Sequence, residues 1–248
     1  MLFNISGLFI GLLFGFLLKR GRFCPTGTIR DIYLEKKYYN AVLILAIIAT
    51  EGLLYHILVG GMTIPSPFFG CYSIIAVPLG AFIFGVGAVL TNGCVTSTLV
   101  KVGDGRIIGI LSLIVFATTE YFTNKWIFKP LTQKVMGLQE VYDIDLFDMP
   151  FSPVFIFLSV AIVLYIIMFR HYMTHKPKYK LPQSYTGIRH VFCEKIWSRE
   201  ITVILMGMVA AAAFYFSNLT GRNGGISISD PVLSWFNMIT GTHSEPIG

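Results

Sequence analysis

Six long apolar segments dominate this sequence and limit what the chain can fold into. They cover residues 3–18, 40–59, 73–91, 106–122, 151–169 and 201–216. Most of them approach the about 20 residues that a membrane-spanning helix needs. The chain is 54% hydrophobic and only 13% charged, which is far more apolar than a soluble domain of its size. These features predict an all-α integral membrane protein with about six transmembrane helices.

Lysine and arginine residues are concentrated in every second loop between these segments. Lysine and arginine number 15 in three alternate loops and only four in the other three. The basic loops are 19–39, 92–106 and 170–200, and the positive-inside rule places them in the cytoplasm. We therefore expect a multi-pass protein of the cell (inner) membrane whose N-terminus lies outside. The same loops explain the net charge of +6, so no nucleic-acid partner is predicted.

The stretch 170–200 is rich in lysine, histidine and proline, a composition typical of a linker. It is predicted to divide the chain. Residues 1–169 would form a five-span membrane unit that holds two cysteine motifs. Residues 201–248 would begin a second membrane repeat.

A shift of 70 residues aligns two copies of one motif. The stretch "FGFLLKRGRFCPTGTI" (14–29) falls on "FGVGAVLTNGCVTSTL" (84–99). The identical positions are Phe14/Phe84, Gly15/Gly85, Cys24/Cys94, Thr26/Thr96 and Thr28/Thr98. Each copy is an apolar helix followed by a cysteine and a cluster of small polar residues. Transporter folds are often assembled from internal repeats, and their sites lie where the repeats meet.

The residue types in this motif predict an anion site at a helix break. Gly27 and Gly93 permit a sharp turn or a close backbone approach, and Asn92 can cap a helix. Hydroxyl groups can satisfy backbone groups freed at the break. In the second copy these are Thr96, Ser97 and Thr98. A short helix starting near each cysteine would direct its first N–H groups at an anion, and the thiol adds a soft, polarisable surface. A small anion with a soft sulfur atom suits this arrangement.

Simpler interpretations of several residues stay open. A membrane cysteine is most often a small apolar residue in packing, which is our interpretation of Cys71 and Cys193. Arg22 is either a topogenic charge at the cytoplasmic interface or a direct anion ligand. Helix packing is the favoured role for five other glycines. These are Gly11, Gly15, Gly80, Gly85 and Gly87.

Two polar residues lie inside the second apolar segment. An acid within a membrane is energetically costly, so Glu51 is either a structural partner or the carrier of a coupling proton. His56 lies near the external end, where contact with water is the simpler expectation. His171 and His175 lie in a basic stretch, so we expect a solvated or headgroup-facing pair and predict no metal site and no cofactor.

Three stretches resemble signatures of a known family. "RGRFCPTGTIRD" (20–31) and "GVGAVLTNGCVTSTLVKVGDGR" (85–106) resemble the two N-terminal signatures of the YeeE/YedE sulfur-transport family. "TGRNGGISIS" (220–229) resembles the segment that opens the family's second half. The resemblance implies a thiosulfate permease built as an inverted-repeat bundle, with short re-entrant helices that carry the cysteine motifs.

The resemblance also implies roles for individual residues. Cys24 and Cys94 would contact the terminal sulfur of thiosulfate through S–H···S hydrogen bonds, with Arg22 and Gly93 in their family positions. A small cytoplasmic sulfur-carrier protein of the TusA type is the implied partner. The family's second half brings another pair of cysteine motifs, whereas this sequence ends at residue 248 before any such pair. We therefore expect a fragment, although a second polypeptide or a shortened family form would also explain the difference.

The predicted function is a transporter rather than an enzyme. It would take up thiosulfate or a related small sulfur-containing anion by a relay between pathway cysteines. The expected substrate-binding residues are Arg22, Cys24, Thr26, Gly27, Asn92, Gly93, Cys94, Thr96 and Ser97. One alternative is a membrane thiol or persulfide enzyme that uses the cysteines covalently. The other is a non-transporting membrane subunit that docks a sulfur carrier through the basic linker.

Overall fold

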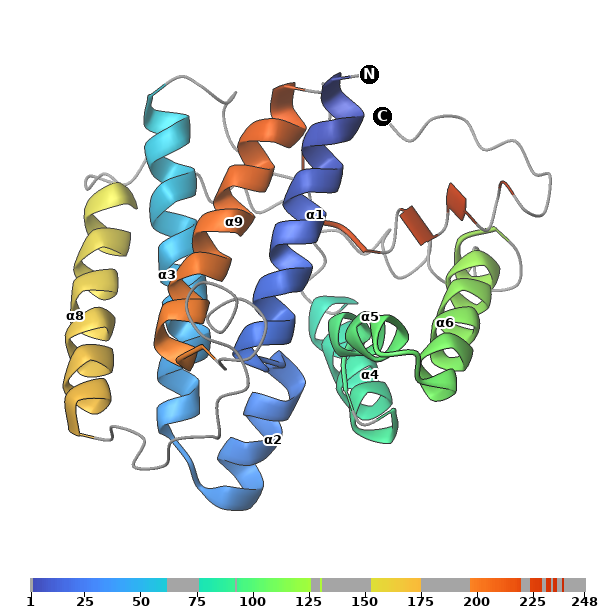
Figure 1. Cartoon of the computed structure of the whole chain (residues 1–248), viewed down its shortest axis with the longest axis horizontal. Helices are drawn as coiled ribbons and strands as arrows, with labels where there is room; N and C mark the ends of the chain where they lie inside the picture. Colours follow the sequence, from blue (N-terminus) through green and yellow to red (C-terminus); the bar gives the residue numbers. More distant parts are fainter. Residues whose placement is uncertain are drawn as a thin grey trace, which may run out of the picture. The chain divides into compact units, whose positions relative to one another are not determined.

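The computed structural model describes residues 2–61, 76–91, 93–125, 130, 153–174, 197–219 and 224–228, and a few single positions up to 238. Over these residues the protein is helical and contains no strand (Figure 1). The helices are α1 (Leu2–Gly21), α2 (Pro25–Glu35), α3 (Tyr39–Gly60), α4 (Ala76–Leu90), α5 (Val95–Gly103), α6 (Ile107–Lys125), α8 (Pro153–Thr174) and α9 (Arg199–Leu219). Each of the six apolar segments therefore contains a helix, and the all-α prediction is confirmed.

Four described stretches are long and apolar enough to cross a membrane, judged by length and composition. They are Tyr39–Gly60, Val77–Gly103, Pro153–Thr174 and Arg199–Leu219. The second is not one continuous helix, because α4 ends at Leu90 and α5 begins only at Val95. A shorter apolar stretch, Ile107–Thr123, lies in α6. The helices thus fit a multi-pass membrane protein, while the count of six spans stays a prediction.

The helices form two compact units, residues 1–66 with 146–225 and residues 67–145 with 226–248. In the first unit α8, α3, α9 and α1 lie side by side in that order (Figure 1). Helix α3 packs against α8, α9 and α2, and α9 also packs against α1. These contacts join α9, which follows the predicted linker, to helices that precede it. Residues 175–196 of that linker lie outside the described residues.

Small residues let the helices of the first unit approach closely. A Cβ added to Gly207 of α9 would lie 2.7 Å from the Cβ of Thr50 of α3. A Cβ added to Gly52 of α3 would lie 2.5 Å from a ring atom of Phe157 of α8. The Thr50 hydroxyl also forms a 2.7 Å hydrogen bond with the Tyr165 hydroxyl of α8. Membrane helices rely on such close contacts and interhelical hydrogen bonds, which here hold α3 between its neighbours.

The glycines that the sequence predicts for helix packing are different ones. A Cβ added to Gly11, Gly15, Gly80, Gly85 or Gly87 would meet no atom within 4 Å. Within the part of the chain that the structure describes, the predicted packing role is therefore wrong for all five. A small residue promotes contact only where another helix lies opposite, and sequence spacing does not show which helix that is.

Two histidines have more buried surroundings than predicted. The His56 side chain is buried, its Nδ1 lies 2.6 Å from the Gly52 carbonyl oxygen, and its ring stacks on Phe157 with centroids 4.7 Å apart. Since a carbonyl oxygen only accepts, Nδ1 is the donor. The expectation that His56 contacts water is wrong, because α8 covers it.

His171 likewise contacts other helices. Its ring stacks on Tyr39 with centroids 3.4 Å apart, and its Nδ1 lies 3.8 Å from the Glu200 carboxylate. Tyr39 donates a 3.1 Å hydrogen bond to the same carboxylate. These contacts connect the start of α3, the end of α8 and the start of α9. The His171 side chain, 30% exposed, is therefore packed against other helices in addition to its predicted solvent or headgroup contact. His175 lies outside the described residues.

In the second unit α5 packs against α6, and a tight turn joins them. Gly105 has a φ of +73°, its N–H donates to the Val102 carbonyl at 2.9 Å, and the Arg106 N–H donates to the Lys101 carbonyl at 3.0 Å. This is the Schellman arrangement, in which a left-handed residue closes the C-terminus of a helix and favours glycine. A Cβ added to Gly109 of α6 would lie 2.8 Å from the Val102 nitrogen, so α6 starts in close contact with α5.

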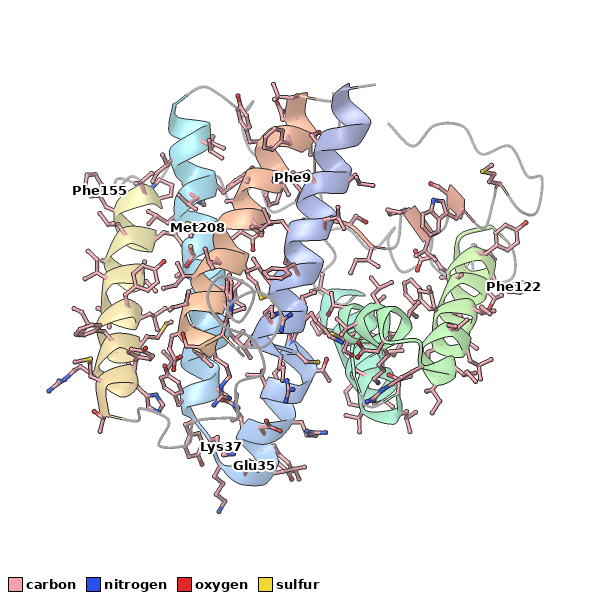
Figure 2. All side chains as sticks on the ribbon, in the orientation of Figure 1. Phe9, Glu35, Lys37, Phe122, Phe155 and Met208 are labelled. Atoms are coloured by element: carbon pink, nitrogen blue, oxygen red, sulfur yellow. The ribbon has the colours of Figure 1, made fainter. Side chains whose placement is uncertain are left out.

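Large apolar side chains project outward from the helices. Phe9 of α1 and Phe155 of α8, both labelled in Figure 2, are 64% and 69% exposed. Phe122 of α6 and Met208 of α9 are also exposed. Soluble proteins rarely expose extensive apolar surface, whereas the hydrocarbon of a bilayer covers it without penalty.

Candidate functional site

The first cysteine motif begins helix α2 in the first unit. Cys24 is the residue before the helix and has an extended backbone with φ −132° and ψ 115°. Pro25 follows as the first helical residue, a position where the missing N–H of proline costs nothing. The Cys24 Sγ accepts a 3.5 Å hydrogen bond from the Gly27 N–H. The thiol thus takes the N-cap position that serine, threonine or aspartate usually occupies.

The second motif begins helix α5 in the second unit with the same local structure. Cys94 is its N-cap, with φ −86° and ψ 177°. The Thr98 N–H and Oγ1 donate to the Cys94 carbonyl at 3.0 and 3.2 Å, and those of Thr28 donate to the Cys24 carbonyl at 2.8 Å each. Both threonines are buried. The sequence repeat is therefore also a structural repeat, and the short helices expected after each cysteine are present.

Thr28 was not expected among the site residues. The sequence did contain a sign of its role: threonine occurs at the equivalent position, Thr98, in the second copy. A residue type kept at the same place in a repeat indicates the same local contact. The contact it makes is to the backbone of the cysteine, so its role is to hold the helix start.

The two thiols are held differently. The Cys94 Sγ lies 2.7 Å from the Thr96 Oγ1, and the Ser97 Oγ donates to the Cys94 carbonyl at 2.8 Å. The Cys94 side chain makes no capping hydrogen bond at the start of α5, in contrast to the Cys24 side chain at the start of α2. Both cysteines are in the thiol form and have intermediate exposure. A side-chain hydroxyl therefore orients one thiol, and a backbone N–H orients the other.

The two helix starts differ in how many N–H groups have no hydrogen-bond partner within the helix. In α5 the first intrahelical bond comes from Thr98, so the N–H groups of residues 95–97 have no carbonyl partner within the helix. In α2, Pro25 has no N–H, and the Gly27 N–H donates to the Cys24 thiol. Only the Thr26 N–H is left for a ligand. Each helix start also carries a partial positive charge. The start of α5 therefore offers more backbone donors than the start of α2.

Gly93 shapes the turn between α4 and α5. It is buried and has a φ of +153°, and an added Cβ would overlap the Ser97 hydroxyl. Its N–H donates to the Ala88 carbonyl at 2.9 Å, and its carbonyl accepts from the Thr91 Oγ1 at 2.8 Å. The Lys101 Nζ donates to the Thr91 carbonyl at 3.5 Å. The sharp turn predicted at Gly93 is confirmed, and no larger residue fits there.

The other predicted residues lie around these two helix starts. Gly27 is inside the first turn of α2, and an added Cβ would make an ordinary 3.6 Å contact with the Cys24 Cβ. Of the two roles predicted for Gly27, a sharp turn or a close backbone approach, the sharp turn is absent, because the chain is already helical there. Thr26 is half-buried in the same turn. Arg22 is exposed, with a φ of +48°, between α1 and α2. Asn92 lies outside the described residues.

The composition of the two motifs favours anions over cations. Residues 22–30 and 92–101 contain no carboxylate. Across the described portion of the chain, no three histidine, cysteine, aspartate or glutamate side chains gather into a group that would hold a metal ion. Unpaired N–H groups, hydroxyls and thiols are hydrogen-bond donors, and an anion is the ligand that such donors bind.

The sequence profile of the family described as "Sulphur transport" matches residues 20–247, which include both cysteine motifs. The chain belongs to the sulphur transport family. The resemblance to YeeE/YedE proteins that the motifs indicated is thereby confirmed. Both helix starts described above lie within the part of the chain that the family profile covers.

Two relatives of this family member are named thiosulfate transporter TsuA. The protein from Escherichia coli (strain K12) is 32% identical over 234 residues, which cover 92% of this chain and 64% of that protein. The protein from Spirochaeta thermophila (strain ATCC 700085 / DSM 6578 / Z-1203) is 27% identical over 255 residues, which cover 95% of this chain and 69% of that protein. The chain thus spans about two thirds of the length of these relatives.

Proposed function

We propose that this protein takes up thiosulfate, or a closely related small sulfur-containing anion, across the inner membrane. Membership of the sulphur transport family and the names of the two relatives support the substrate class. One observation carries the mechanism: each repeated cysteine occupies the N-cap position of a short helix that follows an apolar helix. In this proposal the chain has six spans, α2 and α5 are re-entrant, and the N-terminus lies outside.

The charge of the anion is offset mainly at the start of α5. Thiosulfate carries two negative charges and loses water when it leaves the aqueous phase, so other donors must replace that water. The N–H groups of residues 95–97 supply three donors without partners in the helix. Hydrogen bonds to a charged group contribute about 1.5–3 kcal/mol each. Three of them offset a substantial part of the dehydration penalty.

The thiols would bind the outer sulfur of the anion. A thiol is a weak donor, so Cys94 and Cys24 would hold the sulfur by successive weak S–H···S bonds and release it again. Weak, repeated binding suits a pathway, because conduction requires that the ligand also leaves each site. The Thr96 Oγ1 lies 2.7 Å from the Cys94 Sγ. In this proposal the hydroxyl donates to the sulfur, so the S–H is directed at the anion. A TusA-like sulfur carrier would be the partner on the cytoplasmic side.

Growth on thiosulfate as the sole sulfur source tests this proposal. Cells without their own thiosulfate uptake would express the protein from its complete reading frame. Cys24→Ser and Cys94→Ser should each lower the uptake rate about fivefold or more, as expected for the loss of about 1 kcal/mol of binding. Cys193→Ser, outside the repeat, serves as the control and should grow normally. Wild-type uptake in both motif variants would contradict the relay.

A second measurement separates transport from the two alternative functions. The purified protein, reconstituted alone into proteoliposomes, should take up labelled thiosulfate. Absence of uptake there, together with binding of a sulfur carrier, would favour the docking subunit. A stable persulfide on Cys24 or Cys94 would favour the thiol enzyme.

A further inference from the structure

Import of a dianion into a cell is opposed by the membrane potential. A tenfold concentration ratio corresponds to about 59 mV for one charge. A potential of 100 mV, negative inside, therefore lowers the equilibrium ratio of a free dianion about 2,500-fold. Each proton that moves inward with the anion cancels one negative charge and so raises the equilibrium ratio of inside to outside anion about 50-fold. If the proposed function holds, accumulation of the anion against this potential requires a cation that moves inward with it.

Glu51 is placed where a site for such a cation would lie. It is the thirteenth of the 22 residues of α3, a helix long and apolar enough to span the membrane. The side chain is half-buried, and no hydrogen bond or ion pair holds it among the described residues. An ionisable group in a spanning helix is costly and is by default a functional candidate. A purely structural glutamate would be expected to have a hydrogen-bond or charge partner.

Neither α8 nor α9, the two long helices packed against α3, brings a charged side chain to this depth. Along residues 153–169 of α8 and 201–219 of α9, the only titratable groups are Tyr165, which bonds Thr50, and Tyr215. The charged groups of α8 and α9 lie at the helix ends. They are Arg170, His171, Arg199 and Glu200.

These end groups are remote from the carboxyl. Arg199 and Glu200 bond Asn40 and Tyr39. Asn40 is 11 residues from Glu51, or about 16 Å along the helix.

Helix α2, which also packs against α3, carries Arg30, Asp31, Tyr33 and Glu35.

The other titratable groups of the apolar part of α3 are less suited to carry a proton. His56 donates from Nδ1 to the Gly52 carbonyl and stacks on Phe157, so its ring is held by α3 and α8. The Tyr55 ring packs against Phe214 of α9 with centroids 5.0 Å apart, and a phenol has a pKa near 10. Glu51 alone combines a titratable group with the lack of a fixed partner.

We propose that Glu51 is a proton-binding site that couples inward movement of the anion to inward movement of one proton. The carboxylate takes a proton from the external solution, which makes an O–H bond and removes its charge. The same proton leaves to the cytoplasm after the anion is released, which restores the carboxylate. No other bond forms or breaks. This inference rests on the proposed function.

Proteoliposomes with the complete protein test the coupling. Valinomycin and equal potassium on both sides hold the potential at zero, and the outside is made one pH unit more acidic than the inside. If one proton is coupled, the concentration of labelled thiosulfate at equilibrium should be about tenfold higher inside than outside. Glu51→Gln should accumulate none, but should still exchange labelled for unlabelled thiosulfate. Glu51→Asp should regain accumulation, and the matched variant Glu120→Gln, on α6, should accumulate tenfold like wild type.

The outcomes are distinguishable. Accumulation by Glu51→Gln at the wild-type ratio would overturn the coupling role. So would exchange by the wild type without any accumulation, or loss of both accumulation and exchange in Glu51→Gln and Glu51→Asp. Absence of exchange in the wild type would instead refute the proposed function, and the coupling role with it.

Discussion

Replacing Gly93 with alanine tests how the turn before α5 presents Cys94. A residue with a side chain in this backbone region costs about 1–3 kcal/mol. The added Cβ would also overlap the Ser97 hydroxyl, which donates to the Cys94 carbonyl at 2.8 Å. Loss of that hydrogen bond costs about 1 kcal/mol more. The start of α5 should therefore be destabilised by about 2–4 kcal/mol, and thiosulfate binding should weaken at least tenfold.

Gly27→Ala is the matched control from the other motif. Its added Cβ would make only an ordinary contact 3.6 Å from the Cys24 Cβ. Alanine also has a higher intrinsic helix propensity than glycine, by about 1 kcal/mol. This variant should keep wild-type binding and an equal or higher melting temperature. The assay is thermal unfolding in lipid nanodiscs, together with calorimetric titration of thiosulfate.

The double variant Gly93→Ala, Ser97→Ala separates the two contributions. It removes the hydroxyl that the new Cβ would overlap but keeps the unfavourable φ of +153°. Its melting temperature should lie between those of Gly93→Ala and wild type. The reasoning is refuted if Gly93→Ala binds and melts like wild type, or if Gly27→Ala is equally damaging.

Two further predictions concern helix starts and helix contacts. Thr98→Val keeps the shape of the side chain but removes the hydroxyl that donates to the Cys94 carbonyl, so the free energy of unfolding should fall by about 1 kcal/mol. A melting temperature equal to that of wild type would contradict this role. Gly207→Val would force the α9 backbone away from Thr50 and should lower stability by about 1–3 kcal/mol. Gly11→Val, where an added Cβ meets nothing within 4 Å, should be much milder, and equal losses would show that the α3–α9 contact is not the cause.

The starts of α2 and α5 could be predicted because the signals are local. A capping residue, a following proline or a cluster of hydroxyl residues acts on backbone groups only a few positions away. The repeat strengthened the prediction, since Cys24 and Cys94 occupy equivalent places. The same local reasoning did not exclude a sharp turn at Gly27, because a glycine in the first turn of a helix and a glycine in a sharp turn have similar sequence neighbours.

The sequence by itself determined where the chain is helical and apolar and where the helices break at the two cysteines. Hydropathy, capping and helix propensity depend on neighbours along the chain, so they can be evaluated without a fold. Only the tertiary structure decided that Gly207 and Gly52 make the close helix contacts, and that His56 and His171 stack on Phe157 and Tyr39. Those contacts depend on which helix lies opposite, and residues more than 100 positions apart in the chain meet there.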